Sequence, residues 1–168
     1  MTDIRPISRS AVEFVCLNMR AIDRAEVFGL RGYDLPEAVA NETIFAAAWG
    51  RAGVAFHRGR PAAVVGVAPR WPGVWSAWAY GTEDFAKAAL SVTRFALKDL
   101  KPFVLSRGGH RVEAASRIDH TEAHTWLRAL GARDEGVLRG YGRDGADYVQ
   151  FGWVREYDAP DARSPCSA

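Results

Sequence analysis

The sequence predicts one mixed α/β domain with the element order β-α-α-β-β-β-α-β-α-β-β. Apolar residues alternate along about seven short segments, as in strands, and recur at helical spacing between them. A helical crossover separates the strands 74–80 and 112–118, so these two should run parallel, whereas short turns make their neighbours antiparallel. We therefore expect a twisted, mixed sheet of about seven strands with helices on both faces.

The first fifty residues predict one strand and two helices. The strand at residues 4–6 contains a proline, which limits it to the edge or the end of the sheet. Ser8 or Ser10 can cap a helix that carries apolar residues on one face as far as Ile22. The second helix is expected at Pro36–Trp49, because proline suits a first helical position.

Three consecutive strands are expected next, at residues 53–57, 61–69 and 74–80, with a glycine-containing turn between each pair. Thr82 can cap the long helix that follows, and two acids beside it suit the positive N-terminus of a helix. Pro102 has no backbone N–H and should kink or end this helix.

The remaining elements are a strand at residues 112–118, a helix at 120–130 and two strands at 133–141 and 147–155. Gly131 stands where the helix is expected to stop, since glycine readily ends helices. This strand–helix–strand pattern completes the predicted sheet.

Length and composition favour a single domain, which we assign to residues 1–155, followed by a polar, flexible tail at 156–168. The chain has 168 residues, of which 48% are apolar, enough to bury a core. A net charge of +2 without a Lys/Arg run disfavours nucleic-acid and membrane partners. The sequence shows no signal peptide, membrane span or disulfide framework, so we expect a soluble, cytoplasmic protein.

The element order resembles that of the GNAT acetyltransferases from about residue 4 to residue 155. More narrowly, the chain resembles small GNAT-like proteins of short-tailed lytic phages, some of them internal virion proteins and others acetyltransferase-like modulators of host metabolism. The matching pieces are Ile4-Arg5-Pro6, the strand residues 75–80, the helix residues 120–132 and Val149-Gln150-Phe151.

The resemblance implies that acetyl-CoA binds between the fourth and fifth strands, where GNAT strands splay apart. Its pantetheine arm would face Trp78, Ala79 and Tyr80 on the fourth strand. Its pyrophosphate would lie at the next helix N-terminus, whose backbone N–H groups suit anions. The implied cofactor-binding residues are Trp78, Ala79, Tyr80, Gly81, Thr82, Phe85 and His120. The amine substrate would approach from the far side, over residues 30–42.

Two departures from the GNAT pattern weaken these expectations. The loop that should hold the pyrophosphate has a single glycine and carries Glu83 and Asp84, which repel phosphates or simply suit the first turn of a helix. Leu127 stands where GNAT enzymes place the tyrosine that protonates the leaving thiolate, and leucine cannot donate a proton. We therefore predict weak acetyl-CoA binding.

The candidate catalytic residues are Tyr80, His120 and Glu113. Tyr80 could act as an acid or contact substrate, or simply pack in the core. His120 could donate a proton or fill a structural role at its helix start. Glu113 could serve as general base or be a solvated residue. His120 and His124 lie one helical turn apart, but no third ligand is evident, so we predict no metal.

Two functions follow from these observations. The first is an acetyl-CoA-dependent N-acetyltransferase, in which proximity and a backbone N–H of the fourth strand promote attack by an amine. The second is a catalytically inactive GNAT scaffold that binds a host protein or lies within a phage particle. The acceptor, the partner and the oligomeric state cannot be read from the sequence.

Overall fold

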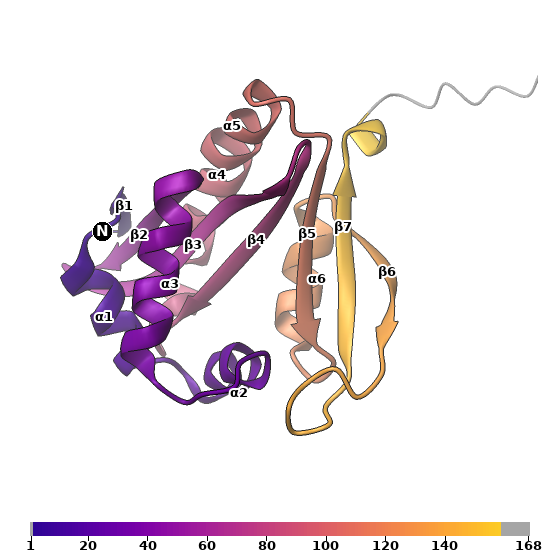
Figure 1. Cartoon of the computed structure of the whole chain (residues 1–168). Coiled ribbons are helices and arrows are strands. Elements are labelled where there is room, and N and C mark those ends of the chain that lie inside the picture. The colour runs from indigo at the N-terminus through magenta and orange to yellow at the C-terminus, as the bar shows by residue number, and fades with distance from the viewer. Residues whose placement is uncertain (1, 159–168) are drawn as a thin grey trace, which may run out of the picture.

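The computed structural model describes residues 2–158 and contains a seven-stranded mixed sheet with the order β1-β2-β3-β4-β5-β7-β6 (Figure 1). The strands are β1 (Thr2–Pro6), β2 (Arg51–His57), β3 (Arg60–Trp71), β4 (Val74–Gly81), β5 (Arg111–Arg117), β6 (Arg133–Leu138) and β7 (Tyr148–Val154). As expected, β4 and β5 run parallel and the other neighbours are antiparallel. The predicted fold class is confirmed.

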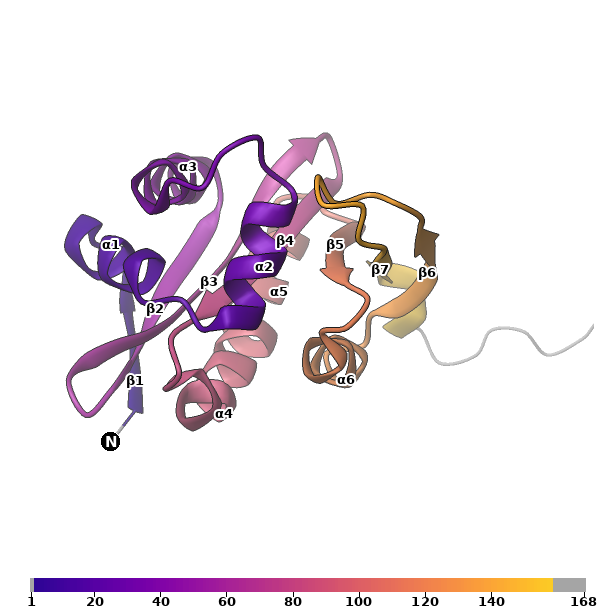
Figure 2. The same cartoon turned by 90° about the horizontal axis from the view of Figure 1, so that it is seen from below.

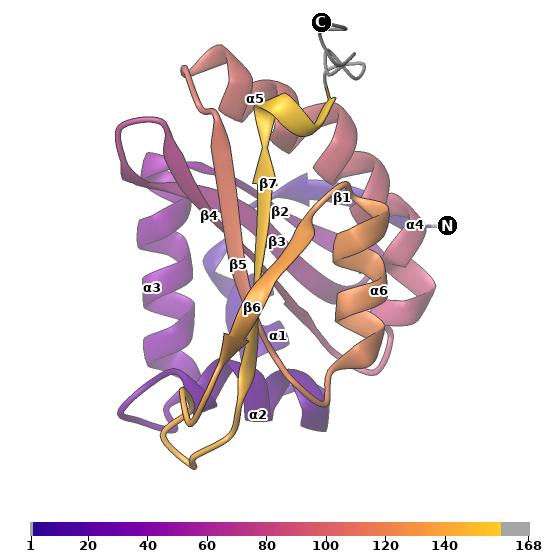
Figure 3. The same cartoon turned by 90° about the vertical axis from the view of Figure 1, so that its right-hand side faces the viewer.

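Helices cover both faces of the sheet, as the views from below and from the side show (Figures 2 and 3). They are α1 (Arg9–Leu17), α2 (Ala21–Gly29), α3 (Pro36–Trp49), α4 (Phe85–Phe95), α5 (Lys101–Ser106) and α6 (Thr121–Ala129). Successive residues of β3 divide the core between the two faces: Val64 packs with α1 and α3, whereas Val65 packs with α4 and α5.

The chain before β2 forms three helices where the sequence predicted two. The first helix ends at Leu17, and Asn18 caps its last turn. The backbone N–H and the side-chain amide of Asn18 both donate to the Phe14 carbonyl oxygen. The Arg20 N–H then bonds Gly81 O, 2.9 Å away, which redirects the chain into α2. Ser8 is the residue that caps α1, through Ala11 N–H.

Three other boundaries differ from the prediction. Pro102 does not end the helix, because a π-helical turn at Ala96–Leu100 precedes it and α5 accommodates it in the first turn. The strand predicted at residues 133–141 ends at Leu138 and contains a bulge after Asp134. A short 3-10 helix, Arg155–Asp158, follows β7, and residues 159–168 of the predicted tail lie outside the described part.

Candidate active site

The strands β4 and β5 diverge and leave a wedge between the two halves of the sheet (Figure 1). Their pairing covers Val74–Ser76 on β4 and ends at the Ser76–Glu113 pair. Beyond that narrow end lies a cavity of about 990 Å³, whose walls include many small side chains. The alanines that line it are Ala46, Ala77, Ala79, Ala89, Ala96, Ala114, Ala115, Ala123, Ala129 and Ala132. A cavity of this size and apolar character suits a ligand.

Backbone groups of β4 face into the wedge. Gly81 directs its N–H to the Asp23 carboxylate, 2.8 Å away, and its C=O to the Arg20 N–H. Because alternate strand residues direct their backbone groups to the same edge, Ala79 points its N–H and C=O into the wedge. Ala79 lies beyond the last β4–β5 pair, so its edge is available to a ligand.

The facing edge of β5 has a matching position. The Arg117 N–H bonds the Glu26 carboxylate at 2.6 Å, and the same alternation directs the backbone groups of Ala115 into the wedge. Ala115 pairs with β7 on its other side. The wedge therefore offers hydrogen-bonding groups on both walls.

The wide end of the wedge is crossed by α2 (Figures 1 and 2). Asp23, whose side chain is 2% exposed, bonds both Gly81 N–H of β4 and Arg20 Nε, each at 2.8 Å. Burial raises the pKa of Asp23, although the Arg20 guanidinium and the Gly81 N–H partly offset that rise.

One turn later on α2, Glu26 reaches the other wall. A single carboxylate oxygen accepts from Arg117 N–H at 2.6 Å and Ser116 Oγ at 2.8 Å, and lies 3.1 Å from His120 Nδ1. We call Arg20, Asp23 and Glu26 the α2 clasp, because they join the end of β4 to the end of β5.

His120, predicted as a catalytic and cofactor residue, belongs to this network. Its side chain is buried between Glu26 and Asp23, with Nε2 3.7 Å from Asp23 Oδ1. Burial by itself lowers the pKa of His120, but the Glu26 hydrogen bond and the charges of Glu26 and Asp23 outweigh it, so the pKa is raised. The His120 ring thus links α6 to the clasp through Glu26 and through Arg20, whose Nη2 lies 3.4 Å from Nε2.

We expect His120 to make stability depend on pH. Its folded-state pKa lies above the ordinary value of 6.5, so its contribution is complete below that value and is lost as pH rises through the folded pKa. The free energy of unfolding, from urea titrations across this range, should fall with rising pH, and His120→Gln should flatten the fall. The same substitution at exposed His110 is the control. Equal slopes for wild type and His120→Gln would contradict the assignment.

The loop between β4 and α4 uses its own backbone donors. Thr82 N–H bonds Ala62 O at 2.8 Å, Asp84 N–H bonds Thr82 Oγ1 at 3.2 Å, and Phe85 N–H bonds Thr82 O at 2.9 Å. With Gly81 N–H on Asp23, four N–H groups of residues 81–85 have partners inside the protein. This arrangement does not fit a pyrophosphate, which needs such donors free.

Charge and space at the same loop also disfavour phosphate. Asp84 pairs with Lys87 at 2.7 Å, which lowers the pKa of Asp84, and Glu83 is exposed beside it. A Cβ at Gly81 would lie 2.5 Å from Ala62 O and 2.6 Å from the Phe85 ring, so a substitution there disturbs the fold. Changing Gly81 would therefore not be a clean test of ligand binding.

Tyr80 lies in the core between the sheet and α1 and α3. Its hydroxyl is 2.7 Å from Thr43 Oγ1 and 3.5 Å from Cys16 Sγ. Burial, followed by the neighbouring Cys16, holds the pKa of Tyr80 well above its ordinary range. The hydroxyl therefore stays protonated, and its observed contacts position β4 against α3.

Glu113 lies at the narrow end of the wedge, apart from His120 and Tyr80. One carboxylate oxygen accepts from Arg70 at 2.8 Å and the other from Arg111 at 2.7 Å. The carboxylate lines the cavity and is 15% exposed. Both oxygens are thus held by arginines where β4 and β5 separate.

The cofactor residues predicted from the sequence fall into two groups. Gly81, Thr82, Phe85 and His120 gather at the wide end, where the Arg20 guanidinium lies 4.6 Å above the Phe85 ring. Trp78, like Tyr80, packs toward α3, and its buried indole N–H has no acceptor among the described residues. Of the predicted cofactor residues, five line the cavity: Trp78, Ala79, Tyr80, Phe85 and His120.

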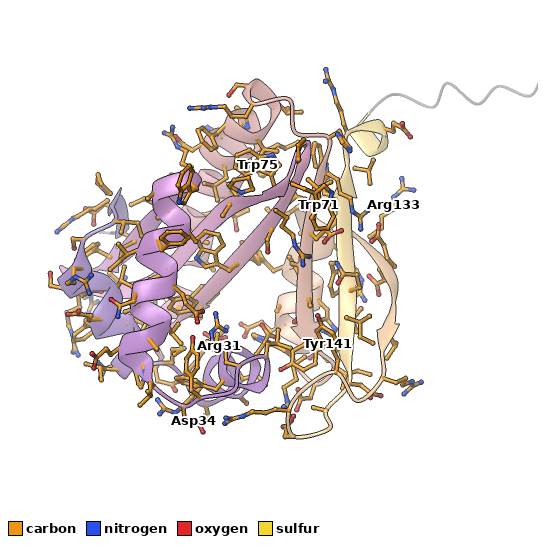
Figure 4. All side chains as sticks on the ribbon, viewed as in Figure 1. Arg31, Asp34, Trp71, Trp75, Arg133 and Tyr141 are labelled. Carbon is orange, nitrogen blue, oxygen red and sulfur yellow. The ribbon has the colours of Figure 1, made fainter. Side chains whose placement is uncertain are left out.

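The open side of the cavity has a polar rim. Arg31, next to α2, and Tyr141, in the loop before β7, lie on opposite sides of the opening (Figure 4). Arg31 Nε bonds Glu42 of α3 at 2.9 Å, and Tyr141 is 55% exposed. Of residues 30–42, over which the sequence predicted an acceptor to approach, Leu30, Arg31 and Glu42 line the cavity.

Sequence reasoning missed the α2 clasp. Arg20, Asp23 and Glu26 follow helical spacing, but their partners at Gly81 and Arg117 are distant in the chain, so spacing alone gave no signal. Among residues 2–158, no group of three His, Cys, Asp or Glu could hold a metal ion, and no helix is long and apolar enough to cross a membrane.

Comparison with solved structures defines the fold. The ribosomal-protein-alanine N-acetyltransferase from Brucella melitensis superposes with a TM-score of 0.72 at 12% identity, covering 90% of this chain and 99% of that chain. A GNAT-family acetyltransferase from Streptococcus pneumoniae gives 0.64 at 16%, covering 92% and 99%. The yncA protein from Salmonella typhimurium, solved with its cofactor acetyl-CoA, gives 0.71 at 13%, covering 96% and 98%. The chain therefore has the GNAT acetyltransferase fold.

At the sequence level, no family model and no curated protein matches the chain.

Proposed function

We propose that the protein is an N-acetyltransferase that takes the pantetheine arm of acetyl-CoA into the wedge between β4 and β5. The observation that carries the proposal is the available backbone edge of Ala79, which faces Ala115 across a cavity of about 990 Å³. The fold of acetyltransferases, including one solved with acetyl-CoA, supports the same assignment. Because fold alone does not establish activity, the proposal depends on this edge.

The residues fit one part of acetyl-CoA and not another. An extended arm with two amides can pair with the Ala79 carbonyl and with the backbone groups of Ala115, much as an added strand would. Small alanine side chains on both walls leave room for it. Four of the five N–H groups at residues 81–85 already have partners inside the protein, so we assign the pyrophosphate no contact there.

The chain's own groups would promote the transfer chiefly by position and electrostatics. Acetyl-CoA would supply the acyl group as a thioester. The Ala79 N–H would donate to the carbonyl oxygen on which negative charge develops during amine attack. The proton of the attacking amine would pass through water to the departing thiolate, which would leave as the CoA thiol. Glu113, whose two carboxylate oxygens are held by Arg70 and Arg111, would help to orient the amine at the narrow end. Tyr80 and His120 would act as positioning residues, because their polar atoms are engaged in the core and the clasp.

The first test is thermal unfolding with acetyl-CoA, CoA and ATP. A ligand at ~100 times its dissociation constant stabilises a protein by about 2.7 kcal/mol. We expect acetyl-CoA and CoA to raise the melting temperature by several degrees and ATP to leave it unchanged. Release of free thiol with a panel of amines would then identify the acceptor. No shift with either thiol cofactor would contradict the proposal.

A non-catalytic scaffold is the second candidate, and one observation favours it. Phe45 and Trp49 are each 68% exposed on the outer face of α3, with ring centroids 6.4 Å apart, an aromatic surface suited to a protein partner. In this alternative a host enzyme or a virion component would be the partner. A phage origin and a cytoplasmic site of action remain part of the proposal from sequence resemblance.

A further inference from the structure

We infer that this protein recognises its acyl donor through the pantetheine thioester alone, and that Asp23 prevents the diphosphate of CoA from binding at the end of β4. The inference rests on the proposed function. If the thioester lies beside Ala79, toward the narrow end, the rest of the donor must leave the wedge at its open side or its wide end. The wide end is where the α2 clasp and the turn at residues 81–85 meet.

The Asp23 carboxylate already accepts the hydrogen bond of the Gly81 N–H, which a phosphate would need. Its carboxylate is 2% exposed and holds Gly81 N–H at 2.8 Å, on the edge of β4 that continues from Ala79. An anion arriving along that edge would have to displace an anion already in place. The next donors, on Thr82 and Phe85, bond oxygens of the protein itself.

The charges at this end oppose a diphosphate as well. Arg20 is the cation closest to Asp23, and it is shared between Asp23 at 2.8 Å and Glu122 at 3.0 Å. Glu26, which contacts His120, adds a carboxylate from α2, and exposed Glu83 adds one from the loop. Like charges in a partly buried site repel strongly, because little water screens them.

The pantetheine arm meets no such opposition, because it is uncharged between the thioester and its terminal phosphate. Its amides can pair with the Ala79 carbonyl and the backbone groups of Ala115, which the clasp leaves available. The two ends of CoA are therefore treated differently by the same wedge. Asp23 is the specificity-determining residue, since it both fills the Gly81 donor and contributes the buried charge.

Calorimetric titration of the wild-type protein with acetyl-CoA and with S-acetylpantetheine tests this directly. We expect dissociation constants within about threefold of each other, because the nucleotide adds no contact. We also expect adenosine 3′,5′-bisphosphate not to compete. If acetyl-CoA binds more than ~30-fold tighter and the bisphosphate competes, the inference is overturned while the proposed function stands. If neither thioester binds, both are wrong.

Asp23→Asn adds an independent reading. The amide oxygen of asparagine can still accept from Gly81 N–H, but the buried negative charge is gone and Arg20 can pair with phosphate. In this variant we expect the affinity for acetyl-CoA, relative to that for S-acetylpantetheine, to rise about tenfold. Glu37→Gln, an exposed change at the start of α3, is the matched control and should leave the ratio unchanged. An unchanged ratio in Asp23→Asn would count against the role of Asp23, and the wild-type comparison decides the question if that variant does not fold.

Discussion

Replacing Ala79 with proline should lower the rate of acetyl transfer by about 10²-fold while the protein stays folded. Proline removes the backbone N–H that we assign to the thioester oxygen. The substitution breaks no hydrogen bond between β3 and β4. The backbone N–H of Ala79, like that of Gly81 two residues later, points into the wedge and away from β3. The measurement is kcat/KM for thiol release, with circular dichroism and thermal unfolding as checks of folding.

Ala79→Ser is the matched control for that experiment, since it changes the side chain and keeps the N–H. It should retain activity within about threefold of the wild type. A folded Ala79→Pro protein as fast as the wild type would place the charge-stabilising donor elsewhere in the wedge.

Gly50→Ala should lower the free energy of unfolding by about 3 kcal/mol or more. A Cβ at Gly50 would lie 1.8 Å from Val67 O and 2.8 Å from Ala68 Cα, and both atoms belong to the backbone of β3. Gly50 is the C-cap of α3, with an extended backbone, so no gain in helix propensity offsets this clash.

Urea denaturation of the variant beside Gly32→Ala makes that test specific. Gly32 has no atom within 4 Å of the position a Cβ would take, so its substitution should change stability little. If the two variants proved equally stable, α3 would not approach β3 as closely as the structure has it.

Local patterns in the sequence were sufficient to predict most of the fold. The alternation along β3 and β4 and the helical spacing along α4 each depend on neighbours within a few residues. The break between α1 and α2 could not be predicted that way. It depends on Arg20 meeting Gly81, a contact that exists only after the sheet has formed.

The candidate site was predicted less completely for the same reason. Alignment with a family pattern gave the wedge and the loop at residues 81–85, and the charges of Glu83 and Asp84 indicated a poor phosphate site. That the Gly81 and Thr82 N–H groups are already bonded follows from Asp23 and Ala62, which approach from other elements. The partners of His120 likewise come from α2.

The short β4–β5 ladder has a consequence for how such a protein can change. The two halves of the sheet are joined only by the short pairing of β4 with β5. Where these strands separate, the distance between their ends is fixed by the hydrogen bonds of Asp23 and Glu26 and not by strand pairing. The same helix leads directly to the rim at Arg31, where an acceptor would enter. If the proposed donor and acceptor sites are correct, a change of α2 that suits a new acceptor would also change the separation of β4 and β5 at the donor site. The two specificities would then evolve together.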